Sequence, residues 1–556
     1  MSNTVSATSS GLWGASDGKD KLARATLTAL LSTVALLWFL WKAKKSRNAG
    51  PPLPPGPRGL PLVGYFPFLR ADLHRQFEEL AGIYGPIYKV WLGEKLCVVV
   101  NSPSLVKEVV RDQDAIFANR DPPIVVLAST FRGADIAFLP HGPDWKKLRK
   151  IFMREMLSNT NLDRSYALRR EEVRKSIKNV YEKIGTPIDF GELAFLTVIS
   201  AIVNMLWGGT KGGVESVHFG AELKILLADL MVVFGAPNVS DFFPVLARFD
   251  LQGYEKRAKS IFEWVERILD TVIEKRRNLV AAKEEGPGSR KNEQSKDFLQ
   301  ILLELTERDD AATSLSINQV KALLMDTMVG GSDTTVTMVE WVMAELMEHP
   351  EVMERVLEEL TEVVGLDNLV EETHLPKLRY LDAVIKETFR LHAPLPFIVP
   401  RRPSQSSTIG GYCIPKDTRV MINVWVIHRD PKIWDSPLEF QPERFLNSKW
   451  DYSGNNFDYL PFGSGRRLCA GLRLAERTLI YIIASFLHAY EWKLPPNTKQ
   501  DLSDIFGIIT KKLSPTIAIP TPSLSHLMNR HMHMTPNWTW MYSNSKFETW
   551  TALVAV

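Results

Sequence analysis

The chain has 556 residues, of which 45% are hydrophobic and 24% charged, as in an ordinary folded protein. This composition excludes a disordered, collagen-like or low-complexity chain. Lys and Arg number 67 against 64 Asp and Glu, and the net charge of +3 is too small to indicate nucleic acid as the main partner. The cysteines, Cys97, Cys413 and Cys469, are too few and too scattered for a disulfide framework, which indicates a reducing compartment.

The first predicted element is a membrane helix over residues 25–41, which follows a polar tail over residues 1–24. Its 17 residues carry no charge and would span about 26 Å, slightly less than a hydrocarbon core of about 30 Å. Trp38 and Trp41 at its end favour the headgroup boundary. Basic residues follow at once, where a signal peptide would need a small-residue cleavage site. We therefore expect an uncleaved, single-pass anchor, not a signal peptide or a core helix. The slight excess of basic residues after the helix favours a cytosolic body.

A basic, Pro-rich linker is predicted over residues 42–64, because six prolines and four glycines within 49–64 exclude a helix. Residues 65–525 are predicted to form one mainly α domain with small β-sheets. Amphipathic periodicity predicts helices over 142–183, 255–280, 316–349, 350–364, 376–392 and 470–490. Short β-like runs occur over 86–99, 407–423 and 513–519. A polar insert over 281–297 is expected to be disordered.

Cys469 lies in the most informative segment, FGSGRRLCAG, which runs from Phe462 to Gly471. Gly465 permits a turn with positive φ, and Gly471 allows a flat ligand to approach closely. A predicted helix begins just after Cys469, and this helix start, with Arg467 nearby, is expected to lower the thiol pKa. One thiolate on a fixed loop suits the axial position of a haem iron, and we prefer this function to a buried structural cysteine.

Together with four further segments in the same order, this decapeptide resembles the cytochromes P450, over about residues 51–524. E-x-x-R alone is a weak signal, because similar pairs arise often by chance, but the ordered set is specific. The resemblance implies a single P450-fold domain that binds haem b through Cys469. It also implies monooxygenation by O2 with electrons from NADPH–cytochrome P450 reductase. The four segments are WKKLR at 145–149, GGSDTT at 330–335, ETFR at 387–390 and PERF at 442–445.

Asp333 and Thr334 are the candidate catalytic residues, because an acid and a hydroxyl together can relay protons to dioxygen. Gly331 before them is expected to weaken the helix and allow a bulge that admits a ligand or water. A solvent-exposed Asp-Thr pair is the plainer alternative.

Several residues are candidates for holding the haem. Arg149 is expected to pair with a haem propionate, and Trp145 shares its helix face at i,i+4 spacing. By resemblance, Arg467 and Arg401 are further propionate partners. The full set of cofactor-binding candidates is Trp145, Arg149, Arg401, Phe462, Gly465, Arg467 and Gly471.

Other charged residues are assigned to support and docking. The resemblance places Glu387, Arg390 and Arg444 in a structural network behind the haem. Lys146, Lys147 and Lys150 form either a docking face for an acidic electron donor or an ordinary solvated helix face.

A mostly apolar set of positions is expected to face the substrate, by resemblance. Such a lining favours a hydrophobic small molecule, although apolar residues are also common in plain core. The candidates are Phe131, Ile136, Phe138, Met328, Gly330, Leu395, Phe397, Ile398 and Ile508.

The anchor, the PPGP segment and the IPTPSLS ending resemble plant P450s of the endoplasmic reticulum membrane. VGGSDTTVTMVEWVMAELM is similar to the sesquiterpene-oxidising group that includes (+)-δ-cadinene 8-hydroxylase, which implies NADPH-dependent hydroxylation of a terpenoid. Flavonoid or phenylpropanoid oxidation is the alternative within the family.

Two further alternatives lie outside monooxygenation. A P450-fold hydroperoxide isomerase or dehydratase would not need the intact Asp333-Thr334 pair. A non-catalytic haem-binding protein would predict a damaged oxygen-activating segment. Residues 526–556 depart from the family pattern, and we interpret them as a disordered appendage or a gene-model artefact.

Overall fold

The computed structural model describes residues 51–131, 134–208, 213–284, 297–310 and 313–522, together with isolated positions between 25 and 36. The described anchor positions are helical, and Leu36 among them is exposed. The rest of the anchor, the linker before residue 51, most of the polar insert and the tail lie outside the described residues. The predictions for these segments therefore stay predictions.

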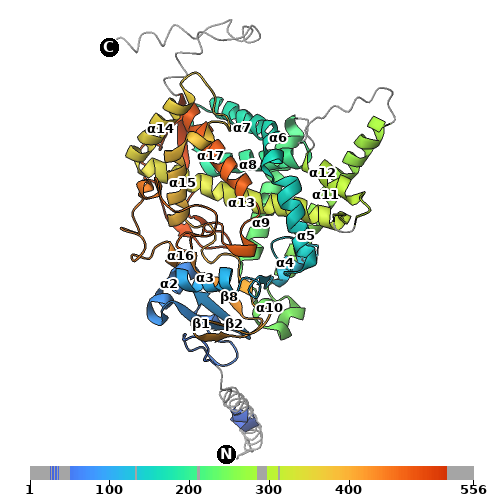
Figure 1. The fold of residues 1–556 in the computed structure, drawn as a ribbon, viewed down its shortest axis with the longest axis vertical. Coiled ribbons are helices and arrows are strands. Elements are labelled where there is room, and N and C mark those ends of the chain that lie inside the picture. The colour runs from blue at the N-terminus through green and yellow to red at the C-terminus, as the bar shows by residue number, and fades with distance from the viewer. Residues whose placement is uncertain are drawn as a thin grey trace, which may run out of the picture.

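The body is mainly helical with small sheets, as predicted from the sequence (Figure 1). Long helices dominate its middle and C-terminal parts. The helices are α2 (Leu73–Tyr84), α3 (Pro103–Lys107), α4 (Ile124–Ser129), α5 (Pro143–Ile151), α6 (Asn159–Arg164), α7 (Tyr166–Tyr181), α8 (Phe190–Trp207), α9 (Gly213–Gly235), α10 (Val239–Phe242), α11 (Tyr254–Glu284), α12 (Phe298–Thr306), α13 (Ile317–Glu348), α14 (Pro350–Val364), α15 (Arg379–Leu391), α16 (Val424–Ile427) and α17 (Leu472–Ala489).

The largest described sheet has the strand order β1-β2-β8-β5-β3. Three smaller ones have the orders β4-β12-β9, β6-β7 and β10-β11. The strands are β1 (Ile87–Leu92), β2 (Lys95–Val100), β3 (Asn119–Arg120), β4 (Ile188–Asp189), β5 (Arg401–Arg402), β6 (Ser407–Ile409), β7 (Tyr412–Ile414), β8 (Arg419–Ile422), β9 (Tyr490–Lys493), β10 (Asp504–Ile505), β11 (Lys511–Lys512) and β12 (Ile517–Pro522).

Strand β2 shows why the large sheet forms where it does. Its side chains alternate between two apolar clusters, so that Val98 and Val100 share a cluster with α3, while Cys97 and Val99 share one with α2. Both faces of the strand are therefore buried, which explains its nearly continuous apolar sequence. In Figure 1 this sheet lies at the end of the body opposite α7 and α14.

Helix α13 runs through the middle of the body and packs against α8, α15 and α17 (Figure 1). Its N-terminus is fixed by a capping box, in which Ser316 and Gln319 each accept the other's backbone N–H. The predicted bulge at Gly331 is wrong, because α13 is one continuous α-helix. Gly331 serves close packing instead, since a Cβ there would lie 3.0 Å from Ile202 of α8.

Three other sequence expectations need correction. The predicted helix over 142–183 is broken at Ser158, whose side chain caps the new helix α6. The insert does not begin at 281, because α11 continues to Glu284. Helix α8 was missed altogether, because 13 of its 18 residues are buried and its sequence has no polar face.

Among the described residues, two segments are long and apolar enough to cross a bilayer, namely α8 and Leu223–Phe242. Most of α8 is buried inside the body, so it is a core helix of this domain. The second segment is 39% buried.

Candidate active site

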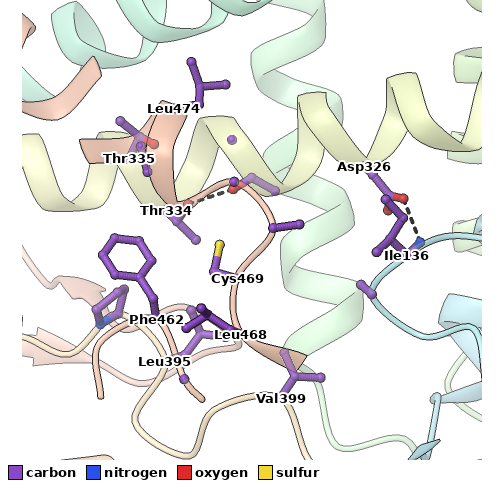
Figure 2. Close-up of a pocket in the computed structure, with 18 of the residues that line it drawn as sticks. Ile136, Asp326, Thr334, Thr335, Leu395, Val399, Phe462, Leu468, Cys469 and Leu474 are labelled. Carbon is purple, nitrogen blue, oxygen red and sulfur yellow. Dashed lines mark hydrogen bonds between the residues drawn. The ribbon is translucent and has the colours of Figure 1, made fainter. Parts of the chain in front are cut away.

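A cavity of about 310 Å³ lies between α13, the loop that follows α4 and the segment before α17. Its walls are mainly apolar, with Ile136, Leu395 and Phe462 among them. Figure 2 shows the Cys469 sulfur at the base of this cavity, pointing toward the Thr334 side of α13. The cavity therefore combines one thiol with a hydroxyl on the opposite wall.

The loop that carries Cys469 is held by backbone hydrogen bonds. The Cys469 N–H donates to the Phe462 carbonyl over 3.0 Å, and the Leu468 N–H donates to the Gly465 carbonyl over 3.0 Å. Gly465 has φ of +65°, and a Cβ there would lie 2.3 Å from the Val110 carbonyl oxygen. The predicted positive-φ turn is thus confirmed, and only glycine fits it.

The expected lowering of the Cys469 pKa is wrong for the protein by itself. Burial raises the pKa of the Cys469 thiol, while the Gly471 N–H, Arg149 and the Leu472 N–H act in the opposite direction. Helix α17 begins at Leu472, so the predicted helix start is in place. Its effect is smaller than the desolvation of the sulfur. Ligation by a metal cation is what deprotonates such a thiol.

Three arginines from different elements line the same cavity: Arg120 of β3, Arg149 of α5 and Arg467 before α17. Within the described residues, none of them has a carboxylate within salt-bridge distance. Their hydrogen bonds go to backbone carbonyls, such as that of Leu468, which accepts from Arg149 over 2.6 Å. Burial, together with repulsion from Arg401 and Arg149, lowers the pKa of Arg467 to about 9.

This arrangement fits a flat cofactor with carboxylate groups. Burial of several unpaired cations is costly, and carboxylates would neutralise them through charge-assisted hydrogen bonds. The thiol at the cavity base supplies a soft ligand for iron. Phe462 also lines the cavity, and it packs against Phe389 with ring centroids 5.1 Å apart. The residues present therefore fit a haem.

Three of the cofactor-binding candidates do not line the cavity, and one of them, Gly465, shapes the cysteine loop instead. Arg401 lies outside the cavity lining, and its guanidinium already has partners, since it donates to Asp114 over 2.9 Å and to the Ser464 carbonyl over 2.6 Å. The indole N–H of Trp145 donates to the Ile136 carbonyl over 3.0 Å. Its ring lies 4.4 Å from the Arg467 guanidinium, so Trp145 positions that arginine.

The two catalytic candidates point in different directions. Thr334 lines the cavity, and its hydroxyl donates to the Gly330 carbonyl one turn earlier over 2.8 Å. Asp333 does not line it and accepts from the Lys511 ammonium of β11 over 2.6 Å. The second carboxylate oxygen of Asp333 is buried and has no hydrogen-bond partner in the described part of the chain. Asp333 thus lies between the partly exposed Lys511 and the cavity wall.

The predicted charged network behind the cavity is present. Glu387 and Arg390 of α15 are both fully buried and pair over 2.7 Å. Arg444 donates to the same Glu387 carboxylate over 3.0 Å. Arg390 also donates to the backbone carbonyls of His428 over 2.9 Å and Pro437 over 2.6 Å. The network therefore ties α15 to the segment that precedes the cysteine loop.

Most predicted substrate-facing positions line a cavity, but one prediction is wrong. Met328 is buried in the main core, because it lies about 200° around α13 from Asp326, at 100° per residue. The other candidates divide among three adjoining cavities. Ile136, Gly330, Leu395 and Ile398 line the main cavity; Phe131 and Phe138 line a side cavity of about 120 Å³; Phe397 and Ile508 line a third of about 230 Å³.

Among the charged residues of the cavity, sequence reasoning missed Arg120, and it placed substrate-facing positions near Asp326 without giving that carboxyl group a role. Arg120 stands in a two-residue strand, where no periodic signal is possible. Asp326 lies eight residues before Thr334 on α13, about 80° around the helix at 100° per residue, so both can line the same cavity. This spacing could have indicated Asp326.

Comparisons with known proteins agree with the site. The family profile described as Cytochrome P450 matches residues 54–518. A flavonoid 3'-monooxygenase from Crocosmia x crocosmiiflora is 35% identical over 512 residues, which cover 90% of this chain and 98% of the relative. A ferruginol synthase from Salvia miltiorrhiza is 34% identical over 499 residues, covering 89% and 98%. A zebrafish cytochrome P450 solved with progesterone has a TM-score of 0.69 and 26% identity, and covers 82% of this chain and 100% of its own.

The match to the family profile includes the residues of the cavity and the cysteine loop. Members of the family carry haem with a thiolate ligand and use O2 with NADPH-derived electrons from a reductase. None of these three relatives is named as a member of the sesquiterpene-oxidising group, so that finer assignment stays a prediction. The chain belongs to the cytochrome P450 family, and it is a haem-thiolate monooxygenase.

Proposed function

We propose that Cys469 is the axial haem ligand and that Arg120, Arg149 and Arg467 hold the haem carboxylates. One observation carries this assignment. One thiol and three arginines, which have no carboxylate partner among the described residues, line the same mainly apolar cavity. Gly471 at the start of α17 leaves the cysteine side open, since a Cβ there would lie 3.9 Å from the sulfur.

The bound haem supplies the oxygen activation, and residues of this chain supply protons and exclude water. The Thr334 hydroxyl reaches the cavity, and Asp333 connects that part of α13 to Lys511, whose side chain is 38% exposed. In this proposal a proton enters at Lys511, passes to Asp333 and reaches the cavity at Thr334. The apolar lining keeps bulk water away.

The proposed substrate is a hydrophobic plant-type secondary metabolite, with a terpenoid such as a sesquiterpene as the first choice. Apolar side chains dominate the walls of the main cavity, which supports a hydrocarbon-rich ligand. Flavonoid oxidation is equally compatible, because the relatives include both a flavonoid 3'-monooxygenase and ferruginol synthases.

The test is product analysis with the full chain, co-expressed with NADPH–cytochrome P450 reductase in microsomes. We expect NADPH-dependent products that carry one added oxygen atom, from sesquiterpenes in preference to flavanones. Oxidation of flavanones alone would contradict the terpenoid assignment. Conversion of a fatty-acid hydroperoxide without NADPH would contradict the monooxygenase function and support the isomerase or dehydratase alternative.

The proposed electron-donor surface is the outer face of α5. Lys146 and Lys150 are exposed there, and Arg466 is half-exposed nearby. Burial lowers the pKa of His141, and both Lys146 and Arg466 lower it further, so the two cations lie on the same side of the body. A basic face of this kind would steer an acidic reductase.

We also propose that residues 25–41 anchor the body, residues 65–525, to the endoplasmic reticulum membrane. The surface near the start of the body supports this proposal, because apolar side chains are exposed on two adjoining segments, residues 60–66 and 242–251. The segments touch through Phe66 and Phe242, whose ring centroids are 5.4 Å apart. The exposed side chains are Leu60, Leu62, Val245, Phe249 and Leu251.

A further inference from the structure

The side cavity contains a polar pair that the proposed chemistry does not use. It opens beside the main cavity, and the two share Ala137, Asp326 and Gly330 in their walls. Most of its remaining lining is apolar, including Phe131 and Phe138. The exceptions are Thr130 and two carboxyl groups, those of Asp326 and Asp135.

Asp326 keeps one oxygen available to a ligand. Its Oδ2 accepts the Ile136 N–H over 2.8 Å, and Figure 2 shows this bond at the end of the cavity away from Cys469. Its other oxygen has no hydrogen-bond partner among the described residues. Fixing the loop at Ile136 needs only one acceptor, so the loop contact does not account for the second oxygen.

Asp135 lines the side cavity together with Asp326 and is also incompletely bonded. It is 3% exposed, and its Oδ1 accepts the Phe138 N–H over 2.7 Å. Its Oδ2 is buried and makes no hydrogen bond within the residues that the structure describes. An unpaired polar atom in such a place is costly, and a ligand that pairs it would relieve the cost.

The charge of the pair favours a neutral partner over a cation. Burial raises the pKa of Asp326 well above its usual range, and Asp135 raises it further. Burial also raises the pKa of Asp135. Both shifts favour the protonated, uncharged form of these carboxyl groups. Arg120, which lines the adjoining main cavity, also opposes a cationic ligand.

We infer that Asp326, supported by Asp135, anchors a hydroxyl group on an otherwise apolar substrate, so that the enzyme selects molecules that are already hydroxylated. This inference rests on the proposed function, because it names the substrate class of the same site. A site built to bond a hydroxyl discriminates strongly against the analogue that lacks it. Asp326 and Thr334 are separated by eight residues of α13, or about 12 Å along the helix. The carbon that is oxidised is thus at the end of the molecule remote from the existing hydroxyl.

The experiment compares matched ligands that differ by one hydroxyl: ferruginol with abietatriene, and 4'-hydroxyflavanone with flavanone. Dissociation constants are measured by absorbance titration of the haem in the full-length holoenzyme. We expect the wild type to bind the hydroxylated member of at least one pair about 10-fold more tightly, equivalent to about 1.4 kcal/mol. In Asp326→Ala this ratio falls to about 3-fold or less, with the affinity for the deoxy compound retained.

Glu340→Ala is the matched control. Glu340 is a partly buried carboxylate of the same helix that accepts a backbone N–H, from Thr516 over 3.0 Å, but it lines none of the cavities described above. Its variant should keep the wild-type ratio. If Asp326→Ala loses its haem, Asp326→Asn replaces it, because the amide oxygen still accepts the Ile136 N–H. The ratio in Asp326→Asn should then fall by about 3-fold.

Three results would overturn the inference alone. They are equal binding within both pairs by the wild type, an unchanged ratio in the haem-loaded Asp326 variant, and tighter binding of dehydroabietylamine than of ferruginol that depends on Asp326. A wild-type protein without a band near 450 nm in the reduced, CO-bound state would instead overturn the proposed haem-thiolate function, and the inference with it.

Discussion

At the residue scale, the three arginines of the main cavity are the groups that most need a partner. Arg149 is the best one to test, because its guanidinium has fewer acceptors among the described residues. It donates to one carbonyl, that of Leu468, whereas Arg467 donates to the carbonyls of Ala118, Ile136 and Leu139. Burial lowers the pKa of Arg149, and the nearby Cys469 opposes this shift. A carboxylate at this point would restore the charge balance.

Arg149→Met should weaken haem retention by about 10- to 100-fold, the value of one buried charge-assisted hydrogen bond. The measurement is haem content per protein after dilution and gel filtration. Arg473→Met on α17 is the control, because Arg473 is exposed. Full haem retention by Arg149→Met would contradict its assignment to a carboxylate.

The Asp333 carboxylate is tested separately from the haem site. Asp333→Asn should keep the haem and lower product formation by about 100-fold, because the amide cannot carry a proton onward from Lys511. Product formed per NADPH consumed is the measurement, with Glu340→Gln as a control that removes a partly buried carboxyl from the same helix. Normal coupling in Asp333→Asn would exclude the proposed proton route.

Residues identified by spacing within one segment were predicted well, and residues brought together by folding were not. Cys469 and Gly465 are fixed by local geometry, so a decapeptide is enough to indicate them. Arg120 meets Arg149 and Arg467 only through the tertiary fold. Arg401 was misplaced because a sequence does not reveal that Asp114 satisfies it.

At the element scale, the Glu387 network contains a fully buried ion pair within α15, and Arg444 of the PERF segment joins it through the same Glu387 carboxylate. Arg390→Leu should lower the free energy of unfolding by about 3–5 kcal/mol, since it leaves the Glu387 carboxylate buried with an incomplete set of partners. Chemical denaturation of the holoprotein measures this change.

The control is Arg355→Ala. Arg355 pairs with Glu443 of the same PERF segment, but both side chains are 48% exposed. The effect of this variant should stay below about 1 kcal/mol. Equal effects of the two variants would show that the Glu387 network contributes no more to the free energy of unfolding than an exposed ion pair does.

The end of α13 has a pH-dependent contact. A hydrogen bond to Glu345 raises the pKa of His349 to about 8. Glu351 also raises the pKa of His349. His392 contacts the same Glu345 carboxylate, and burial lowers the pKa of His392. Since the folded pKa of His349 lies above the ordinary value near 6.5, its stabilisation is complete below about pH 6.5 and is lost as the pH rises through about 8.

His349→Gln should therefore lower the melting temperature by a few degrees at pH 6, and the difference from the wild type should shrink above pH 8.5. Differential scanning calorimetry at three pH values checks this. A difference that does not change with pH would assign the effect of His349 to packing instead.

The predictability of an element depends on whether it has a polar face. Helices α13, α14, α15 and α17 lie close to their predicted ranges. Helix α8 has no such face and was missed, because its sides are covered by other helices, α7 and α13 among them. Strand β12 begins four residues after the predicted start at 513, since Ser514 and Pro515 interrupt the run.

At the scale of the whole molecule, the long helix α13 runs through the middle of the body (Figure 1) and lines the cavity that also contains the thiol and the three arginines. The sheet end carries the exposed apolar side chains, and α5 carries the exposed lysines. The proposed membrane contact and the proposed reductase contact therefore lie on different surfaces of the body. The cavity and the cysteine loop join the two.

The most direct test of the haem-thiolate assignment is the reduced, CO-bound absorption spectrum of the full chain. The wild type should show a band at about 450 nm, which is specific for a thiolate-ligated haem. Cys469→Ala should abolish this band, while Cys97→Ala and Cys413→Ala should keep it. A band that survives in Cys469→Ala, or its absence from the wild type, would contradict the assignment of Cys469 as the haem ligand.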